Sequence, residues 1–267
     1  MKEKIQNHFG MSRLPFSKTI STSELFITSS IKSISERLSL AVGNEDFALI
    51  SGTAGSGKSS AIRYFISQLD KTTYPHVYIT AEKYKIGDIG KLILHGLNME
   101  VPYNGYEALR KLHSVILKLN SDQNIKPVIV IDEAQELPIS TLSSIKNITN
   151  FEIDSRSRIA FIFVGQSQLI NKLNMNELSS LKRRIRIRFK FNNLSVEDTM
   201  RFIEHQLKMA GVTKAIFTED AKNEIFRLSN GIICNINNIC YDLIVNAVEK
   251  SLDIIEPSLL NTILAGE

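Results

Sequence analysis

The chain has 267 residues, of which 43% are hydrophobic and 22% are charged, an ordinary globular composition with enough apolar material for a sizeable core. Its two cysteines, Cys234 and Cys240, exclude a disulfide framework and favour a reducing compartment. The net charge of +4 is compatible with a nucleic-acid partner but does not require one.

The sequence shows neither the pattern of a membrane span nor that of an N-terminal export signal. The sequence contains no apolar run long enough for a transmembrane helix. The first eight residues carry charge but lack the apolar stretch of a signal peptide. We therefore expect a cytoplasmic protein with no membrane partner.

In chain order, residues 1–46 lack a strong strand pattern and are expected to form an irregular lead-in and a first helix, packed on the core. Apolar strand patterns then alternate with amphipathic helix patterns, which predicts an α/β domain with a mainly parallel sheet at 47–193. After Asn193 only helical patterns remain, so 194–267 is predicted to be a small all-helical domain. The strands are expected at 47–50, 77–80, 127–131, 159–164 and 184–191, and the helices between them at 61–69, 86–97, 106–119 and 141–151.

A glycine-rich loop follows the first predicted strand and matches G-x-x-x-x-G-K-[ST] without a mismatch. Its glycines let successive backbone N–H groups point at phosphate oxygens, and the next helix adds the positive end of its dipole. Lys58 is expected to neutralise the β- and γ-phosphates, and the Ser59 hydroxyl to ligate Mg²⁺. ATP and Mg²⁺ are therefore the expected cofactors. The residues expected to hold the nucleotide are Gly52, Thr53, Ala54, Gly55, Ser56, Gly57, Lys58, Ser59 and Ser60.

Two carboxylates end the next fully apolar strand. Asp132 and Glu133 follow Val128-Ile129-Val130-Ile131, at the sheet edge where α/β proteins bind ligands. Asp132 is expected to hold Mg²⁺, directly or through water, and Glu133 to polarise the attacking water. The alternative is a strand end capped by two solvated acids.

Gln166 follows the fourth predicted strand and is the first choice for a side chain that holds the water or the γ-phosphate, with Ser167 as the second choice. Arg183 or Arg184, just before the fifth strand, is a candidate arginine finger for a neighbouring subunit. The basic residues beyond alternate with apolar ones, which places the charges on one face of a strand. That face is either a charge-protected edge or a stripe for nucleic-acid phosphates. The candidate nucleic-acid contacts are Lys182, Arg186, Arg188 and Lys190.

With these residues in place, the chain resembles an AAA+ ATPase of the ExeA-like group over nearly its whole length. The markers are Phe9-Gly10-Met11 with Pro15-Phe16, Leu25-Phe26 with Ser29, the glycine-rich loop, Asp132-Glu133-Ala134-Gln135, Val164-Gly165-Gln166 and Phe217-Thr218. The resemblance implies a P-loop NTPase with a parallel five-stranded sheet and a C-terminal helical lid. It also implies that Lys58 and Ser59 belong to Walker A, Asp132 and Glu133 to Walker B, and Gln166 to the sensor.

One position departs from the group. The lid usually carries Gly-x-Pro-Arg-x-Ile-Asn, whose Arg contacts the γ-phosphate, whereas this chain reads Gly231-Ile232-Ile233-Cys234-Asn235-Ile236-Asn237. Cys234 cannot supply that charge, so we expect either slow hydrolysis of ATP to ADP and phosphate, as in a switch, or a partner that supplies the missing charge.

The group contains short ATPases encoded beside transposases, similar in role to MuB, TniB and TnsC, and secretion ATPases with a membrane span and a peptidoglycan-binding region. The length and the basic segment favour the first set. The expected function is an ATP-dependent regulator of transposition that oligomerises on double-stranded DNA and recruits or stimulates a transposase. The alternative is a secretion-type ATPase acting on envelope protein partners. A signalling ATPase whose lid binds another protein has only the fold in its favour.

Overall fold

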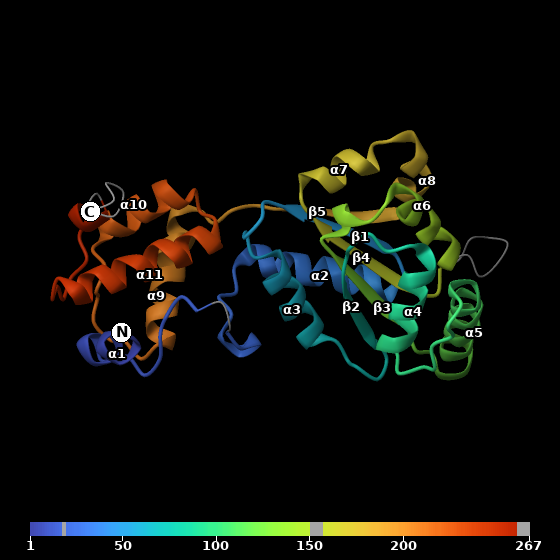
Figure 1. Cartoon of the computed structure of the whole chain (residues 1–267), viewed down its shortest axis with the longest axis horizontal. Coiled ribbons are helices and arrows are strands. Elements are labelled where there is room, and N and C mark those ends of the chain that lie inside the picture. The colour runs from blue at the N-terminus through green and yellow to red at the C-terminus, as the bar shows by residue number, and fades with distance from the viewer. Residues whose placement is uncertain (18–19, 150–156, 261–267) are drawn as a thin grey trace. The chain divides into compact units, whose positions relative to one another are not determined.

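The computed structural model describes residues 1–17, 20–149 and 157–260, and Figure 1 labels their helices and strands. The chain divides into two compact units. The α/β unit comprises Ser29–Gly52 and Lys58–Phe191. The helical unit comprises Met1–Thr28, Thr53–Gly57 and Asn192–Glu267.

A parallel five-stranded sheet forms the centre of the α/β unit, as the sequence predicted. The strands lie in the order β2-β3-β4-β1-β5, and every neighbouring pair is parallel. Because parallel strands end at the same edge, the segments after β3 and β4 lie next to each other. The strands are β1 (Phe47–Gly52), β2 (His76–Thr80), β3 (Val128–Asp132), β4 (Ala160–Gly165) and β5 (Ile185–Phe191).

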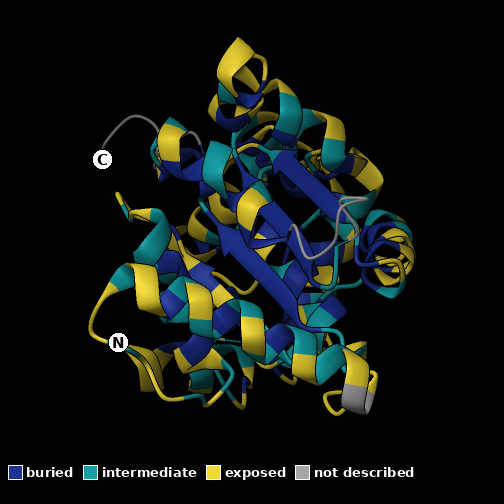
Figure 2. Ribbon diagram, turned by 90° about the vertical axis from the view of Figure 1, so that its right-hand side faces the viewer, coloured by how far each residue is buried: buried dark blue, intermediate teal, exposed yellow. Residues whose placement is uncertain are grey.

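Helices cover both faces of this sheet, which explains why its inner strands are apolar throughout. The helices α2 and α3 contact β1 on one face, where α2 buries Ile34 and Leu38 and α3 buries Phe65. The other face packs in one apolar cluster with the remaining helices of the unit. The inner strands are almost wholly buried, and Figure 2 shows strands of this sheet in the dark blue of buried residues. The helices are α2 (Ser29–Gly43), α3 (Lys58–Gln68), α4 (Ile86–Gly96), α5 (Gly105–Gln123), α6 (Ile139–Ile148), α7 (Ser167–Leu173) and α8 (Ser179–Arg184), with the short 3-10 helices η2 (Ala134–Glu136) and η3 (Asn176–Leu178).

The helical unit has its own apolar core, and the side chains of Ser195 and Thr218 cap α9 and α10 by accepting backbone N–H groups. Residues 257–260 begin another helical segment. Within the part of the chain that the structure describes, no helix is both long enough and apolar enough to span a bilayer. The helices of this unit are α1 (Lys2–Phe9), α9 (Val196–Met209), α10 (Glu219–Ser229) and α11 (Ile233–Glu249), with the 3-10 helix η1 (Thr22–Glu24).

The N-terminal segment packs on the C-terminal helices, which differs from the predicted packing of residues 1–46 on the α/β core. Ile5, Met11 and Phe16 share one apolar cluster with α9, α10 and α11. The lead-in also begins with a helix, α1, that the sequence analysis missed, because Ile5 is its one buried residue. Only α2 of the predicted lead-in lies in the α/β unit.

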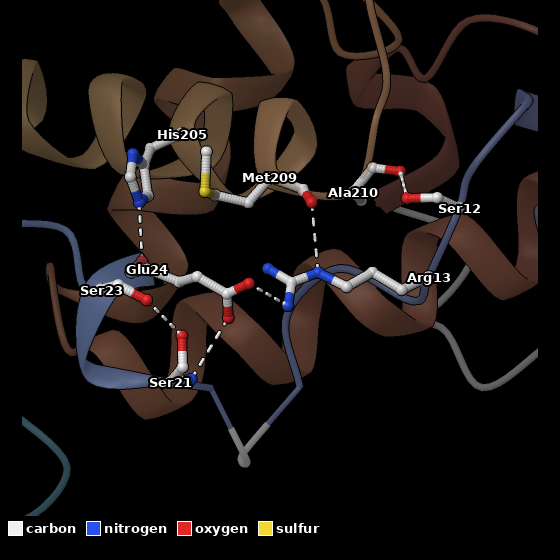
Figure 3. A network of polar contacts seen from close by, with 8 residues as sticks. All are labelled: Ser12, Arg13, Ser21, Ser23, Glu24, His205, Met209 and Ala210. Carbon is white, nitrogen blue, oxygen red and sulfur yellow. Dashed lines mark hydrogen bonds and ion pairs between the residues drawn. The ribbon is translucent and has the colours of Figure 1, made fainter.

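Polar contacts hold the same segment against the end of α9 (Figure 3). Arg13 pairs with Glu24 at 2.7 Å, and its Nε donates to the carbonyl of Met209 at 3.1 Å. His205 Nε2 donates to the carbonyl of Glu24 at 2.8 Å. The hydrogen bond from the Arg13 side chain is the largest cause of the lowered pKa of the Glu24 carboxyl. These contacts tie the N-terminal segment to the last turn of α9, where a cation interacts favourably with the helix dipole.

Other differences are local. The sequence predicted no helix between the fourth and fifth strands, but α7 starts there at Ser167. The predicted helix 141–151 is observed as α6, which begins two residues earlier, and its predicted end at Phe151 lies outside the described residues.

Candidate functional site

The two carboxylates lie at the carboxyl end of β3, a strand whose five residues are all buried. Asp132 is 6% exposed, so its charge needs hydrogen-bond donors. Glu133 has a φ of 51°, in the left-handed region that a non-glycine residue rarely adopts. Such strain persists where the surroundings impose it, as at functional sites.

Asp132 accepts hydrogen bonds from three donors. Ser59 Oγ, in the first turn of α3, donates to Asp132 Oδ2 at 2.9 Å. The Tyr78 hydroxyl, from the neighbouring strand β2, donates to the same oxygen. The backbone N–H of Glu133 donates to Oδ1 at 2.9 Å. The structure therefore brings together Ser59 and Asp132, the two residues predicted to hold Mg²⁺.

Tyr78 reaches Asp132 because the strands are in parallel register. Thr80 lies opposite Asp132 and Tyr78 opposite Val130, so Tyr78 and Asp132 are diagonal neighbours on one face. Burial, with the bond to Asp132 as the next cause, raises the pKa of the Tyr78 hydroxyl far above its usual range. The phenol therefore stays protonated and remains a donor.

Lys58 is buried at the start of α3, with 5% exposure, and its Nζ donates to the carbonyl of Gly52 at 3.1 Å. Burial lowers the pKa of Lys58, while the charges of Glu133 and Asp132 raise it. The predicted phosphate-binding lysine thus lies in the field of both the predicted base, Glu133, and the predicted Mg²⁺ ligand, Asp132.

Glu133 and Gln166 are also in contact. Gln166 Nε2 donates to Glu133 Oε2 at 3.2 Å. Gln135, in η2, donates its Nε2 to the same carboxylate oxygen. Its Oε1 accepts the backbone N–H of Gln166 at 3.1 Å. Ser167, the second choice for the sensor, is exposed in the first turn of α7.

Residues 53–57 of the glycine-rich loop lie in the helical unit, against the first turn of α11. The Cys234 N–H donates to the Gly55 carbonyl at 3.1 Å, and Thr53 Oγ1 donates to Asn193 Oδ1 at 2.7 Å. A Cβ on Gly55 would lie 2.6 Å from the Cys234 Cβ, so this approach requires glycine. The position that departs from the ExeA-like pattern therefore contacts the phosphate-binding loop directly.

The basic side chains of residues 182–190 differ in how far they are buried and in what they contact. Arg184 Nη1 donates to the Thr149 hydroxyl at 2.6 Å and to the Lys146 carbonyl at 3.1 Å, at the C-terminus of α6. Burial lowers the pKa of Arg184. Arg183 is exposed, which leaves it better placed than Arg184 to reach another molecule.

Along β5, the predicted alternation is confirmed, since Arg186, Arg188 and Lys190 are exposed. Arg186 pairs with Asp46 at 3.4 Å, and Arg188 donates to the Lys182 carbonyl at 2.7 Å. Lys182 donates to Asn174 Oδ1 at 2.8 Å. These exposed contacts are weak enough for a phosphate to compete with them.

Tyr78 and Gln135 are members of the site that the sequence analysis did not assign. A tyrosine in a short alternating strand is ordinary, and its partner depends on which strand lies beside it. Gln135 was noted only as part of a family pattern. The sequence signal that could have pointed to it is its position two residues after Glu133, the predicted base, whereas its contact with the end of β4 is visible only in the structure.

The comparisons with known proteins agree with this geometry. Residues 42–173 match a family model described as an AAA domain. The chain is 30% identical over 248 residues to General secretion pathway protein A of Aeromonas hydrophila, covering 91% of this chain and 44% of that protein. The chain therefore spans less than half the length of this curated relative.

Solved structures share the fold. Cdc6p from Pyrobaculum aerophilum has a TM-score of 0.70 at 20% identity, covering 91% of this chain and 68% of that one. The Aeropyrum pernix ORC2 protein in its ADP form has a TM-score of 0.71 at 14% identity, covering 94% and 71%. The Aeropyrum pernix ORC1 protein in complex with DNA has a TM-score of 0.64 at 16% identity, covering 94% and 66%.

The AAA-domain match runs from before β1 to the end of α7. It includes the loop Gly52–Ser59 between β1 and α3 and the carboxylates after β3, and it covers four of the five strands of the parallel sheet. With these observations together, residues 42–173 form an AAA domain, and the chain shares its fold with Cdc6p and the ORC proteins.

Proposed function

We propose that ATP and Mg²⁺ bind at Gly52–Ser60 and that hydrolysis uses the carboxylates after β3. The observation that carries this proposal is the contact between Ser59 and Asp132 at 2.9 Å beside the buried Lys58. A hydroxyl and a carboxylate form the all-oxygen donor set that Mg²⁺ prefers, with phosphate oxygens and water completing the shell. Bound Mg²⁺ would neutralise charge that develops on the phosphates.

The protein's own groups then have separate tasks. Lys58 holds the β- and γ-phosphates by charge, and Glu133 accepts a proton from the attacking water. Gln166, whose side chain already contacts Glu133 at 3.2 Å, orients that water or the γ-phosphate. Ser56 also suits a bound phosphate, because its Oγ is buried without a hydrogen-bond partner among the described residues.

For the cellular role, we propose a secretion-type ATPase that acts on envelope protein partners. The support is the 30% identity to General secretion pathway protein A across 91% of this chain. This is the role that the sequence analysis ranked second, and the curated comparison favours it over transposition. In this role, ATP binding and slow hydrolysis switch the chain between states with different affinity for a partner.

A second candidate is an ATP-dependent DNA-binding regulator that assembles into oligomers on double-stranded DNA. Its specific support is the exposed row Arg186, Arg188 and Lys190 on β5, which could contact successive phosphates. A structural neighbour solved with DNA, the ORC1 protein, is compatible with it. A transposase as the partner has only the family resemblance in its favour.

One binding experiment separates the two roles. The purified protein is titrated against fluorescent duplex DNA with a non-hydrolysable ATP analogue at low and moderate salt, and its mass is measured in parallel. The secretion role predicts no ATP-dependent DNA binding. Binding that needs ATP, falls steeply with salt and is lost in R186A/R188A/K190A would instead establish the DNA-binding role.

A further inference from the structure

Gln135 lies between the two side chains that the proposed mechanism places around the attacking water. It is 7% exposed and belongs to the 3-10 helix η2, directly after Glu133 and Ala134. Its amide N–H contacts Glu133 Oε2, and its amide oxygen accepts the Gln166 backbone N–H at 3.1 Å. Because Gln166 Nε2 also contacts Glu133 Oε2 at 3.2 Å, the three residues form a closed triangle.

The chemistry of the partners fixes the orientation of the Gln135 amide. A carboxylate can only accept a hydrogen bond, and a backbone N–H can only donate one. Turning the amide over would place its oxygen against the Glu133 carboxylate and its NH₂ group against the Gln166 N–H. Both contacts would then be repulsive, so one orientation satisfies the triangle.

The surroundings of Gln135 hold it in place. A Cβ on Gly165, the last residue of β4, would lie 2.6 Å from Gln135 Oε1, so the amide needs a glycine there. Lys172 Nζ, from α7, donates to the backbone carbonyl of Gln135, and also to that of Leu137 at 3.1 Å. The segment after β3 is thus fixed to the element after β4 through both backbone and side chain.

We propose that Gln135 is a positioning residue that couples the Glu133 carboxylate to the segment after β4. It fixes one carboxylate oxygen and the Gln166 backbone together, so that the base and the proposed γ-phosphate sensor keep one geometry relative to each other. The inference rests on the proposed role of Glu133 as the base. Gln135 itself touches neither nucleotide nor water in this scheme.

The test is Gln135→Met, which keeps the length of the side chain and removes both amide contacts. We expect kcat to fall by about 10- to 100-fold, the cost of a misplaced catalytic group, while the affinity for a fluorescent ATP analogue changes by less than about twofold. The matched control is Gln168→Met, an exposed glutamine in α7, which should keep the parental kcat.

A double-variant cycle tests the coupling itself. If the triangle acts as a unit, Gln135→Met combined with Gln166→Met should lose little more kcat than the worse single variant. If the kcat loss of the double variant equals the product of the two single-variant losses, Gln135 and Gln166 act independently, and the proposal is overturned. A kcat within about twofold of the parent in Gln135→Met, or an equal loss of ATP affinity and kcat, would also overturn it.

Two further variants keep the test decisive. Should Gln135→Met fail to fold, Gln135→Glu preserves the shape and the acceptor for Gln166 but sets a second carboxylate against Glu133. It should lose kcat in the same way, and full activity would overturn the proposal. Glu133→Gln, assayed in parallel, reports separately on the base assignment: activity there means that the base is wrong, whatever the cycle shows.

Discussion

At the scale of single residues, the site is organised by donors that point at two carboxylates. Asp132 accepts from Ser59, Tyr78 and a backbone N–H, and Glu133 accepts from two glutamine amides. None of the donating side chains carries a formal charge. They therefore orient the two carboxylates without neutralising their negative charge. A metal or a water proton can therefore still be attracted to them.

Removing the Tyr78 hydroxyl should weaken the binding of Mg²⁺. Outer-shell partners of metal-ligating carboxylates typically contribute about 10- to 100-fold in metal affinity, and we expect Tyr78→Phe to raise the half-saturating Mg²⁺ concentration by about that factor. The measurement is a Mg²⁺ titration of fluorescent ATP-analogue binding, with affinity in EDTA as the reference. Tyr103→Phe, at a side chain that is 98% exposed, is the control, and an unchanged Mg²⁺ midpoint in Tyr78→Phe would contradict the prediction.

Lys58 and Glu133 should separate binding from hydrolysis. Lys58→Ala removes the buried cation and is expected to abolish or strongly weaken ATP binding. Glu133→Gln should retain binding and lose about 10²- to 10⁴-fold in kcat, the usual contribution of a general base. Equilibrium binding and phosphate release distinguish the two, and full hydrolysis by Glu133→Gln would show that another group is the base.

At the scale of elements, the sequence predicted those segments whose residues are either buried throughout or buried with a regular period. The apolar run of β3 and the alternation along β5 were both readable, because each position faces a fixed side of the sheet. The helix α1 was missed because it buries only Ile5, and α7 because it has seven residues. The roles of Tyr78 and Gln135 depend on the strand order β2-β3-β4, which local patterns do not contain.

Arg184 should stabilise the α/β unit by holding the end of α6. Hydrogen bonds to charged groups contribute about 1.5–3 kcal/mol, and Arg184 makes two such bonds, to Thr149 and to the Lys146 carbonyl. We expect Arg184→Met to lower the free energy of unfolding by an amount of that order, measured by chemical denaturation. The neighbouring, exposed Arg183→Met is the control and should leave stability unchanged; equal losses would contradict this role for Arg184.

The first turn of α11 should affect the hydrolysis rate through Cys234. Its N–H contacts the Gly55 carbonyl at 3.1 Å, while its side chain is exposed. Cys234→Arg restores the cation of the ExeA-like pattern beside the phosphate-binding loop, and we expect a higher kcat. Cys234→Ser keeps the size without the charge and should match the parent, whereas an unchanged rate in Cys234→Arg would mean that the departure is neutral.

At the scale of the whole molecule, the position of Arg183 argues for assembly. The residue comes just before β5, whose first residue lies opposite Phe47, the first residue of β1. It lines a cavity of about 630 Å³ with Asp46 and Lys126, at the amino edge of the sheet. Asp132 ends β3 at the carboxyl edge, about a strand length, or roughly 17 Å, away. If Arg183 is the predicted arginine finger, it can therefore act only on a γ-phosphate held by a second copy of the chain.

Mixing two inactive variants tests this arrangement. Arg183→Ala keeps its own nucleotide site but offers no finger, and Lys58→Ala offers Arg183 but binds no ATP. Arginine fingers contribute about 10³- to 10⁵-fold in GTPases, and we expect each variant alone to lose at least about tenfold in hydrolysis. Their mixture should recover activity, because Arg183 of one copy can complete the site of the other. Lys58→Ala/Arg183→Ala in place of Lys58→Ala should give no recovery; full activity of Arg183→Ala alone, or no recovery in co-assembled mixtures, would rule out a finger at this position.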